Sequence, residues 1–280
     1  MDTSNISSAF GAFTASLATK ALERRASDGY TLDSEGFYIC PNCKTRASAY
    51  NEALGCMIPS ECECRKAERL KREESERITS LEKRRVASFT ASNMLESRFE
   101  SDNGSNSRIS DVMHRFVENF DEYRTVGRGI LLFGKSGVGK SFFAGAVGNA
   151  LIDRGYRVYQ TSISRLESEC AESYNKQSVI DGRIYTTDLI ILDDFGAERQ
   201  SDYMKEFSFR VINSLYEAKR SFFVTTNLSS AEIKKTSDAD NVRIYQRIIE
   251  RCVPIEVDGE SQRVAGFAES FFRDKKVLGF

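Results

Sequence analysis

The chain has 280 residues, of which 40% are hydrophobic and 29% are charged, and its formal net charge at pH 7 is −1. This length allows one large domain and a small one. The near-neutral charge excludes a globally basic nucleic-acid-binding protein, and no apolar run approaches the roughly 18 residues that a membrane span needs. Residues 1–20 lack the basic segment and apolar core of a secretory signal, so we expect a cytoplasmic protein without membrane contact.

Residues 1–35 are predicted to form an N-terminal helical segment. Its large apolar side chains recur at roughly helical spacing, and they are Phe10, Phe13, Leu17 and Leu22. Two interpretations stay open: this apolar face packs on its own domain, or it docks on a partner protein.

Residues 36–64 are predicted to form a zinc-binding module, because they hold five of the seven cysteines of the chain. Clustered cysteines in a chain without an export signal favour a metal over disulfides. Cys40 and Cys43 form a CxxC pair, which offers zinc two ligands from one turn. A site of four thiolates has no open coordination position, so we expect the zinc to be structural.

The second ligand pair is less uniquely specified. Cys62 with Cys64 is the favoured pair, and Cys56 with one of those two is the alternative. His114, the only histidine, lies outside this zone and is not expected to be a ligand.

Residues 65–100 are predicted to be a helical linker. Its first part, 65–85, has no Gly or Pro and carries nine basic residues against five glutamates. The apolar stripe is thin, so a solvated connector is expected, and a DNA contact by its positive charge is the alternative.

Residues 101–280 are predicted to form an α/β domain, because apolar strands alternate with helical segments, as in a parallel sheet. The expected strands are 129–133, 157–161, 188–193, 221–226 and 253–257. The expected helices are about 139–153, 202–218 and 241–251.

A phosphate-binding loop, "GKSGVGKS", follows the first of these strands and opens a helix, which is the context that makes this motif specific. Its glycines let backbone N–H groups converge on phosphates. Lys140 would give a charge to the β- and γ-phosphates, and the Ser141 hydroxyl could bind Mg²⁺. The predicted nucleotide-binding residues here are Gly134, Lys135, Ser136, Gly137, Val138, Gly139, Lys140 and Ser141.

An acidic pair ends the apolar strand in "LIILDDFG". Asp193 is expected to hold Mg²⁺, and Asp194 to orient or deprotonate the attacking water. Glutamate is commoner than aspartate at the second position. The alternative for the pair is a helix N-cap.

Three further residues are candidates for sensing the γ-phosphate. Asn227, at the end of "SFFVTTN", can contact the phosphate or position water, although Asn also suits a turn. One of the arginines that recur every four residues in "NVRIYQRIIERC" could reach the site of a neighbouring subunit. Arg263, after the last strand, could reach the nucleotide in its own subunit.

The motifs "GKSGVGKS", "LIILDDFGAE", "TTNLS", "RIYQRIIERC" and "DGESQR" occur in this order. Together they resemble the DnaC/DnaI helicase loaders and the related IstB transposition ATPases of the AAA+ class, over residues 90–265. The cysteine-rich front end resembles, more loosely, the zinc-binding N-terminal domain of DnaI-type loaders. The resemblance implies an AAA+ P-loop fold behind a small zinc-binding domain and a helical linker.

By position, the resemblance implies Asn227 as sensor 1, Arg247 as the arginine finger and Arg263 as sensor 2. It also places Ser201 and Tyr203 where loaders face single-stranded DNA. The alternative is that Ser201 caps a helix and Tyr203 packs below it.

The predicted function is an Mg²⁺-dependent ATPase that loads a hexameric replicative DNA helicase onto single-stranded DNA. Its zinc module would bind the helicase, and its AAA+ domain would bind ATP and self-associate. The alternatives are an IstB-like regulator of a transposase, and a zinc-dependent adaptor with an ATP switch and negligible turnover.

Overall fold

The structure is a computed structural model, and it describes residues 3–199, 201–235, 239–262, 271, 275 and 277–278, without the side chains of 3–12, 234–235 and 239–240. The chain divides into two compact units, Met1–Ser80 and Leu81–Phe280.

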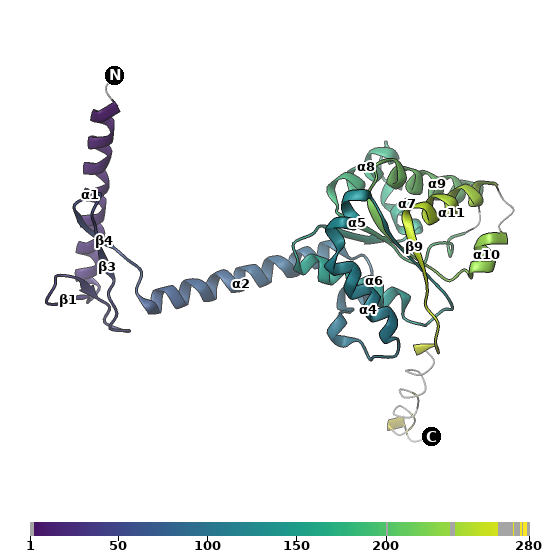
Figure 1. Ribbon diagram of the computed structural model, residues 1–280, viewed down its shortest axis with the longest axis horizontal. Coiled ribbons are helices and arrows are strands. Elements are labelled where there is room, and N and C mark those ends of the chain that lie inside the picture. The colour runs from purple at the N-terminus through teal and green to yellow at the C-terminus, as the bar shows by residue number, and fades with distance from the viewer. Residues whose placement is uncertain are drawn as a thin grey trace. The chain divides into compact units, whose positions relative to one another are not determined.

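The first unit consists of a helix and two short antiparallel hairpins (Figure 1). Its elements are α1 (Thr3–Ser27), β1 (Thr31–Leu32), β2 (Tyr38–Ile39), β3 (Ser48–Asn51), β4 (Cys56–Pro59) and the start of α2 (Glu63–Ser88). The helix is shorter than the predicted 1–35, because the chain turns after Ser27 at Gly29, whose φ of 82° suits glycine. Along α1, Leu22 is buried whereas Phe13 and Leu17 are more than half exposed.

The interior of the first unit is small. Its buried apolar cluster consists of Cys40, Ala47 and Cys62, with Tyr30 packed against it. So few side chains bury too little apolar surface to order the chain, and a structural metal commonly supplies the missing stability in modules of this size.

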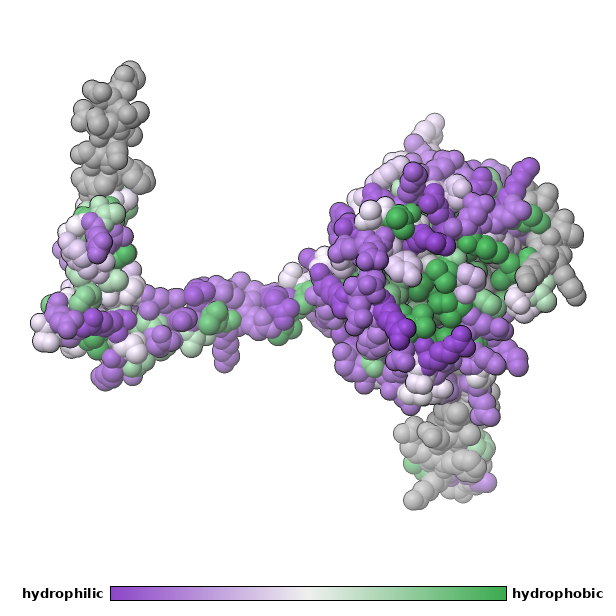
Figure 2. Space-filling model, viewed as in Figure 1, coloured by the Kyte–Doolittle hydropathy of each residue, from purple (hydrophilic) through white to green (hydrophobic). Residues whose placement is uncertain are grey.

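Hydrophilic residues cover most of α2 (Figure 2), as the predicted connector requires. Its exposed charges form ion pairs, as Arg69 does with Glu73 one turn along the helix and with Glu61 just before the helix begins. From Leu81 onward, however, the helix belongs to the second unit: Arg85 is buried and pairs with Asp153. The last part of the segment predicted as linker therefore packs within the second unit.

The second unit contains a five-stranded parallel sheet in the order β6-β7-β8-β5-β9. Its strands are β5 (Gly129–Phe133), β6 (Val158–Thr161), β7 (Leu189–Leu192), β8 (Ser221–Thr226) and β9 (Cys252–Glu256). Each lies within one residue of its predicted bounds, so the prediction of a parallel α/β domain is confirmed.

Helices cover both faces of this sheet (Figure 1). Alternate strand residues point to opposite faces, so Ile130 joins one hydrophobic cluster and Leu131 the other. One face packs against α3 (Ser92–Glu96), α4 (Ser107–Glu118), α5 (Phe120–Val126) and α6 (Lys140–Asp153). The other packs against α7 (Ile163–Ala171), α8 (Lys176–Thr186), α9 (Asp202–Glu217) and α11 (Ala239–Arg251).

Two short helices, η1 (Phe99–Ser101) and α10 (Ser230–Lys235), complete the described elements. Within residues 101–280, the predicted helices correspond to α6, α9 and α11, whereas α4, α5, α7, α8 and α10 were not predicted. Within the described part of the chain, no helix combines the length and apolar character that a membrane span requires.

Candidate nucleotide and zinc sites

The phosphate loop lies between β5 and α6, which begins at Lys140. Gly134 has a φ of 145°, and a Cβ there would lie 2.3 Å from the carbonyl oxygen of Val257, so no other residue fits. The loop lines a cavity of about 210 Å³, which also receives Lys140, Ser141 and Asn227. Five of the eight predicted loop residues therefore line one cavity at the N-terminus of α6, a position that favours anions, and they are Ser136, Gly137, Gly139, Lys140 and Ser141.

Lys140 is held at the centre of this site. Its Nζ donates to the carbonyl oxygens of Gly134 at 2.9 Å and Lys135 at 2.7 Å, and to Oδ1 of Asn227 at 2.7 Å. The Asn227 amide in turn lies 3.4 Å from Oδ1 of Asp194. The structure thus brings together Lys140, Asn227 and Asp194, three of the side chains that the sequence assigned to the γ-phosphate end of the nucleotide.

Ser141 and Asp193 supply the oxygen ligands that Mg²⁺ prefers. The Ser141 hydroxyl donates to Oδ1 of Asp193 at 2.9 Å. Burial raises the pKa of the Asp193 carboxyl, the hydrogen bonds from Thr225 and Ser141 lower it, and the net result is a raised pKa. A partly buried carboxylate beside a hydroxyl fits a divalent cation, which would favour the charged carboxylate and neutralise phosphate charge.

Asp194 adopts a left-handed backbone conformation with a φ of 51°. This turn carries the chain out of β7 and directs the residue toward the phosphate cavity, whose lining includes Asp194. The helix-cap alternative for the acidic pair does not apply, because the next helix, α9, begins at Asp202 and is capped by Ser201.

Arg247 lies on α11 and stacks on two aromatic rings of α9. Its guanidinium carbon is 4.6 Å from the ring centre of Phe209 and 5.7 Å from that of Tyr216. The contacts recorded for Arg247 among the described residues include none with the phosphate loop of the same chain. Its role as an arginine finger therefore stays a prediction about a neighbouring subunit, and Arg263 lies outside the described residues.

Ser201 and Tyr203 stand at the start of α9. The Ser201 hydroxyl accepts from the backbone N–H of Met204 at 3.3 Å, as an N-cap does. Tyr203 is 48% exposed, and its hydroxyl bonds to Glu167 and to Lys176. The ring is therefore available at the surface, whereas Ser201 has a structural role.

Four cysteines of the first unit form a metal-type cluster: Cys40, Cys43, Cys62 and Cys64, whose sulfur atoms all lie within 4.8 Å of one another. Four sulfurs about 2.3 Å from one zinc ion would lie about 3.8 Å apart, so this spacing fits tetrahedral zinc. Cys56, the alternative ligand, is outside the cluster and pairs with Asn51 in the hairpin. The ring of His114 stacks on Phe99 in the second unit.

The protonation behaviour of these thiols also suits a cation. The hydroxyl of Thr45, 3.0 Å from the Cys43 sulfur, and nearby backbone N–H groups lower the pKa of Cys43 to about 5. Hydrogen bonds with the sulfurs of Cys62 and Cys40 raise the pKa of Cys64 to about 12. All four thiolates can be charged together only if a bound cation offsets their repulsion.

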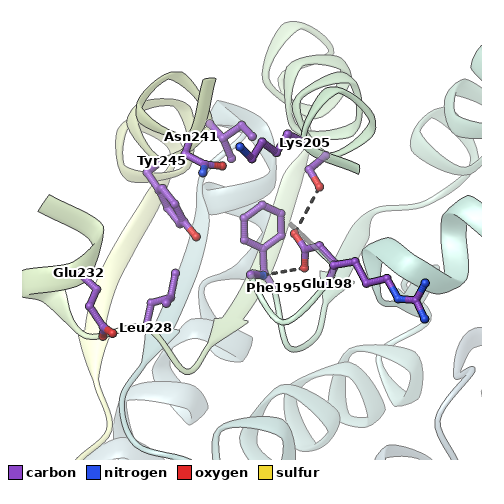
Figure 3. A pocket seen from close by; sticks show the side chains of 11 residues that line it. Phe195, Glu198, Lys205, Leu228, Glu232, Asn241 and Tyr245 are labelled. Carbon is purple, nitrogen blue, oxygen red and sulfur yellow. Dashed lines mark hydrogen bonds between the residues drawn. The ribbon is translucent and has the colours of Figure 1, made fainter. Parts of the chain in front are cut away.

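A second cavity, of about 360 Å³, is lined partly by Phe195, Gly196 and Glu198 from the loop that follows the acidic pair (Figure 3). Phe195 and Tyr245 form its walls, and the carboxylate of Glu198 accepts from the Gly196 backbone N–H and the Ser208 hydroxyl. It is larger than the cavity at the phosphate loop, but it lacks Lys140 and the acidic pair. We therefore assign the nucleotide to the smaller cavity.

Four residues at the nucleotide site were missed from the sequence: Asn93, Phe142 and Gln262, which line the phosphate cavity, and Thr225. Thr225, fully buried on β8, bonds to both Asp193 and the backbone of Asp194. The available signal was the polar pair that ends the otherwise apolar stretch "SFFVTT", since a buried hydroxyl needs a partner.

A glycine-rich loop between strand and helix, with an acidic pair and an asparagine on adjacent strands, defines a P-loop ATP-binding protein of the AAA+ type. The family model described as IstB-like ATP binding protein matches residues 42–269. The chain belongs to this family.

Two relatives and one solved structure are similar to this chain. The replicative helicase loader DnaI of Bacillus subtilis (strain 168) is 27% identical over 174 residues, which are 56% of this chain and 55% of that protein. The insertion sequence ATP-binding protein y4iQ/y4nD/y4sD of Sinorhizobium fredii (strain NBRC 101917 / NGR234) is 30% identical over 148 residues, 51% of this chain and 49% of that protein. The crystal structure of the DnaC helicase loader is 25% identical with a TM-score of 0.50, covering 60% of this chain and all of that one. This chain thus spans about half the length of the curated relatives it matches.

Proposed function

We propose that this protein is an ATPase that loads a hexameric replicative DNA helicase onto single-stranded DNA. The observation that carries the proposal is the four-cysteine cluster ahead of a phosphate-loop cavity, in a chain with helicase loaders among its relatives. The ATP site alone suits both branches of the family, because the insertion sequence protein is matched as well.

In the proposed mechanism, the phosphate loop and Lys140 bind and orient the β- and γ-phosphates. Ser141 and Asp193 would hold Mg²⁺, which supplies charge neutralisation at the phosphates. Asp194 accepts the proton of the attacking water, and Asn227 fixes the geometry between Lys140 and Asp194.

In this proposal, the zinc-bearing first unit binds the helicase. Zinc would keep its two hairpins rigid, which lowers the entropic cost of binding a partner. The ATPase unit would self-associate, with Arg247 completing the site of its neighbour, and Tyr203 would stack on a base of single-stranded DNA.

The test uses the full-length tagged protein, purified with zinc from its native cells, and identifies its partner by mass spectrometry. Co-purification of the replicative helicase, lost in Cys40→Ser and kept in Cys56→Ser, supports the loader. The purified pair should then unwind a forked DNA coated with single-strand-binding protein only when ATP is present.

A transposase as the specific partner would instead support an IstB-like regulator. The adaptor alternative predicts helicase capture with no ATP turnover above that of Lys140→Ala. Asp194 keeps this alternative open, because its side chain is one methylene shorter than the commoner glutamate.

A further inference from the structure

The hydroxyl of Thr225 lies between the two aspartates of the acidic pair. Its Oγ1 donates to Oδ1 of Asp193 at 2.6 Å and accepts from the backbone N–H of Asp194 at 2.9 Å. Thr225 is fully buried, so water cannot replace either bond.

The direction of these bonds is fixed by chemistry. A carboxylate oxygen only accepts, so the single hydroxyl proton of Thr225 points to Asp193, and a lone pair remains for the N–H of Asp194. Oδ1 of Asp193 receives a second hydrogen bond from Ser141. The orientation of the Asp193 carboxylate is therefore set by two hydroxyls, one from α6 and one from β8.

Thr225 also hydrogen-bonds to the chain just beyond the last paired residues of β7 and β8. The pairing of β7 with β8 ends at Leu192 and Val224, because the chain leaves β7 at the acidic pair. The backbone N–H of Phe195 then donates to the carbonyl oxygen of Thr225 at 2.8 Å. Thr225 on the neighbouring strand thus accepts hydrogen bonds from the backbone N–H groups of both Asp194 and Phe195. These two bonds hold the left-handed turn at Asp194 in place.

We propose that Thr225 is a positioning residue that sets the carboxylate of Asp193 and the backbone turn of Asp194 for nucleotide hydrolysis. The inference rests on the proposed ATPase activity. Because Asn227 follows directly after the last residue of β8, the same strand end orients the acidic pair and carries the side chain that contacts Lys140.

The experiment compares Thr225→Val, which keeps the branched shape, with Thr225→Ser, which keeps the hydroxyl. Outer-shell partners of metal ligands typically contribute roughly 10- to 100-fold to activity or metal affinity. We expect Thr225→Val to lower kcat by that factor with KM for ATP little changed, and Thr225→Ser to restore it. Thr161→Val is the matched control, because Thr161 is a fully buried threonine on β6, two strands away from β8, and its hydroxyl donates to the carbonyl oxygen of Ser162.

A second readout is the gain in affinity for a fluorescent ATP analogue on adding Mg²⁺, measured alongside thermal unfolding. Thr225→Val should reduce this gain, whereas Thr161→Val should keep it. Wild-type kcat and wild-type Mg²⁺ dependence in Thr225→Val would overturn the inference. If the wild type shows no turnover, the proposed ATPase activity fails, and the Mg²⁺-dependent affinity still decides the role of Thr225.

Discussion

Nζ of Lys140 lies 2.7 Å from Oδ1 of Asn227, so the lysine of the phosphate loop and the asparagine at the end of β8 share a hydrogen bond. The bond joins residues 87 positions apart in the sequence. It identifies the side of the phosphate cavity at which the γ-phosphate would end.

Asn227→Ala should therefore impair the chemical step more than nucleotide binding. Removing one oriented polar group at the reacting phosphate is expected to lower kcat by roughly 100-fold, as for other preorganised donors. Steady-state kinetics and the affinity of a fluorescent ATP analogue measure the two effects separately. Asn213→Ala is the control, because this amide bonds to Glu217 on the surface of α9; equal kinetics in the two variants would contradict a sensing role.

The zinc site allows an internal comparison. Cys64→Ser should abolish stoichiometric zinc, and Cys56→Ser should retain it, because only the former removes a sulfur of the cluster. Zinc content is measured by atomic emission on purified protein, and unfolding of the first unit by a chelator is followed by circular dichroism. Loss of zinc in Cys56→Ser would show that the second ligand pair is wrongly assigned.

Arg247 can be tested by mixing inactive variants. Lys140→Ala lacks a working site of its own but keeps Arg247, and Arg247→Ala has the reverse defect. If Arg247 acts on a neighbouring subunit, mixing the two should restore part of the ATPase activity, because mixed interfaces pair an intact site with an intact arginine. No recovery on mixing, with both variants folded and associating, would leave Arg247 as a stacking partner of Phe209.

Tyr203→Ala should weaken binding to single-stranded DNA by about 1–3 kcal/mol, the usual contribution of one stacked base. Fluorescence anisotropy with a labelled oligothymidine at fixed salt measures this. Tyr185→Ala is the matched control, since Tyr185 is also exposed and also lies near a cation, Arg220. An identical loss in both variants would point to a general effect rather than to a site at α9.

Asp188 gives a prediction about pH. Burial raises the pKa of its carboxyl, but hydrogen bonds from the side chain and backbone of Arg157 outweigh burial, so the pKa lies below the ordinary 3.8. A carboxyl with a lowered folded-state pKa contributes stability above its unfolded pKa and loses it as the pH falls through the folded value.

Asp188→Asn should therefore cost about 1–2 kcal/mol at pH 7, from weakened hydrogen bonds to Arg157. The difference from the wild type should shrink below pH 3.8, the ordinary value of an Asp carboxyl. Urea unfolding at several pH values measures it. Asp121→Asn, at a mostly exposed side chain, should change little; a pH-independent deficit in Asp188→Asn would refute the ionic explanation.

The sheet and the nucleotide site could be predicted because their signals are local. A buried parallel strand is a continuous apolar run, as Leu189–Leu192 is, and the phosphate loop follows such a run directly. The hairpins of the first unit gave no such signal, because strands of two to four residues are too short to show alternation. In the first unit the spacing of the cysteines was the signal that predicted the module, whereas in the second unit the runs of hydrophobic residues were.

The role of Thr225 depends on register, which one sequence does not reveal. Whether its hydroxyl meets Asp193 is decided by the pairing of β7 with β8, which places Leu192 opposite Val224. The α4 and α5 helices escaped prediction for a related reason: Phe116 and Phe120 look like scattered aromatics until the sheet against which they pack is known.

The backbone of Asp194 bears on the choice of its side chain. With a φ of 51°, the residue occupies a region that, after glycine, aspartate and asparagine adopt several times more readily than other residues. Asp194→Glu would introduce the longer acidic side chain that is commoner at this position. Glutamate, however, adopts the left-handed conformation less readily than aspartate does. The short side chain of Asp194 thus suits the left-handed turn, and a variant that lengthens this side chain is expected to change the backbone conformation as well.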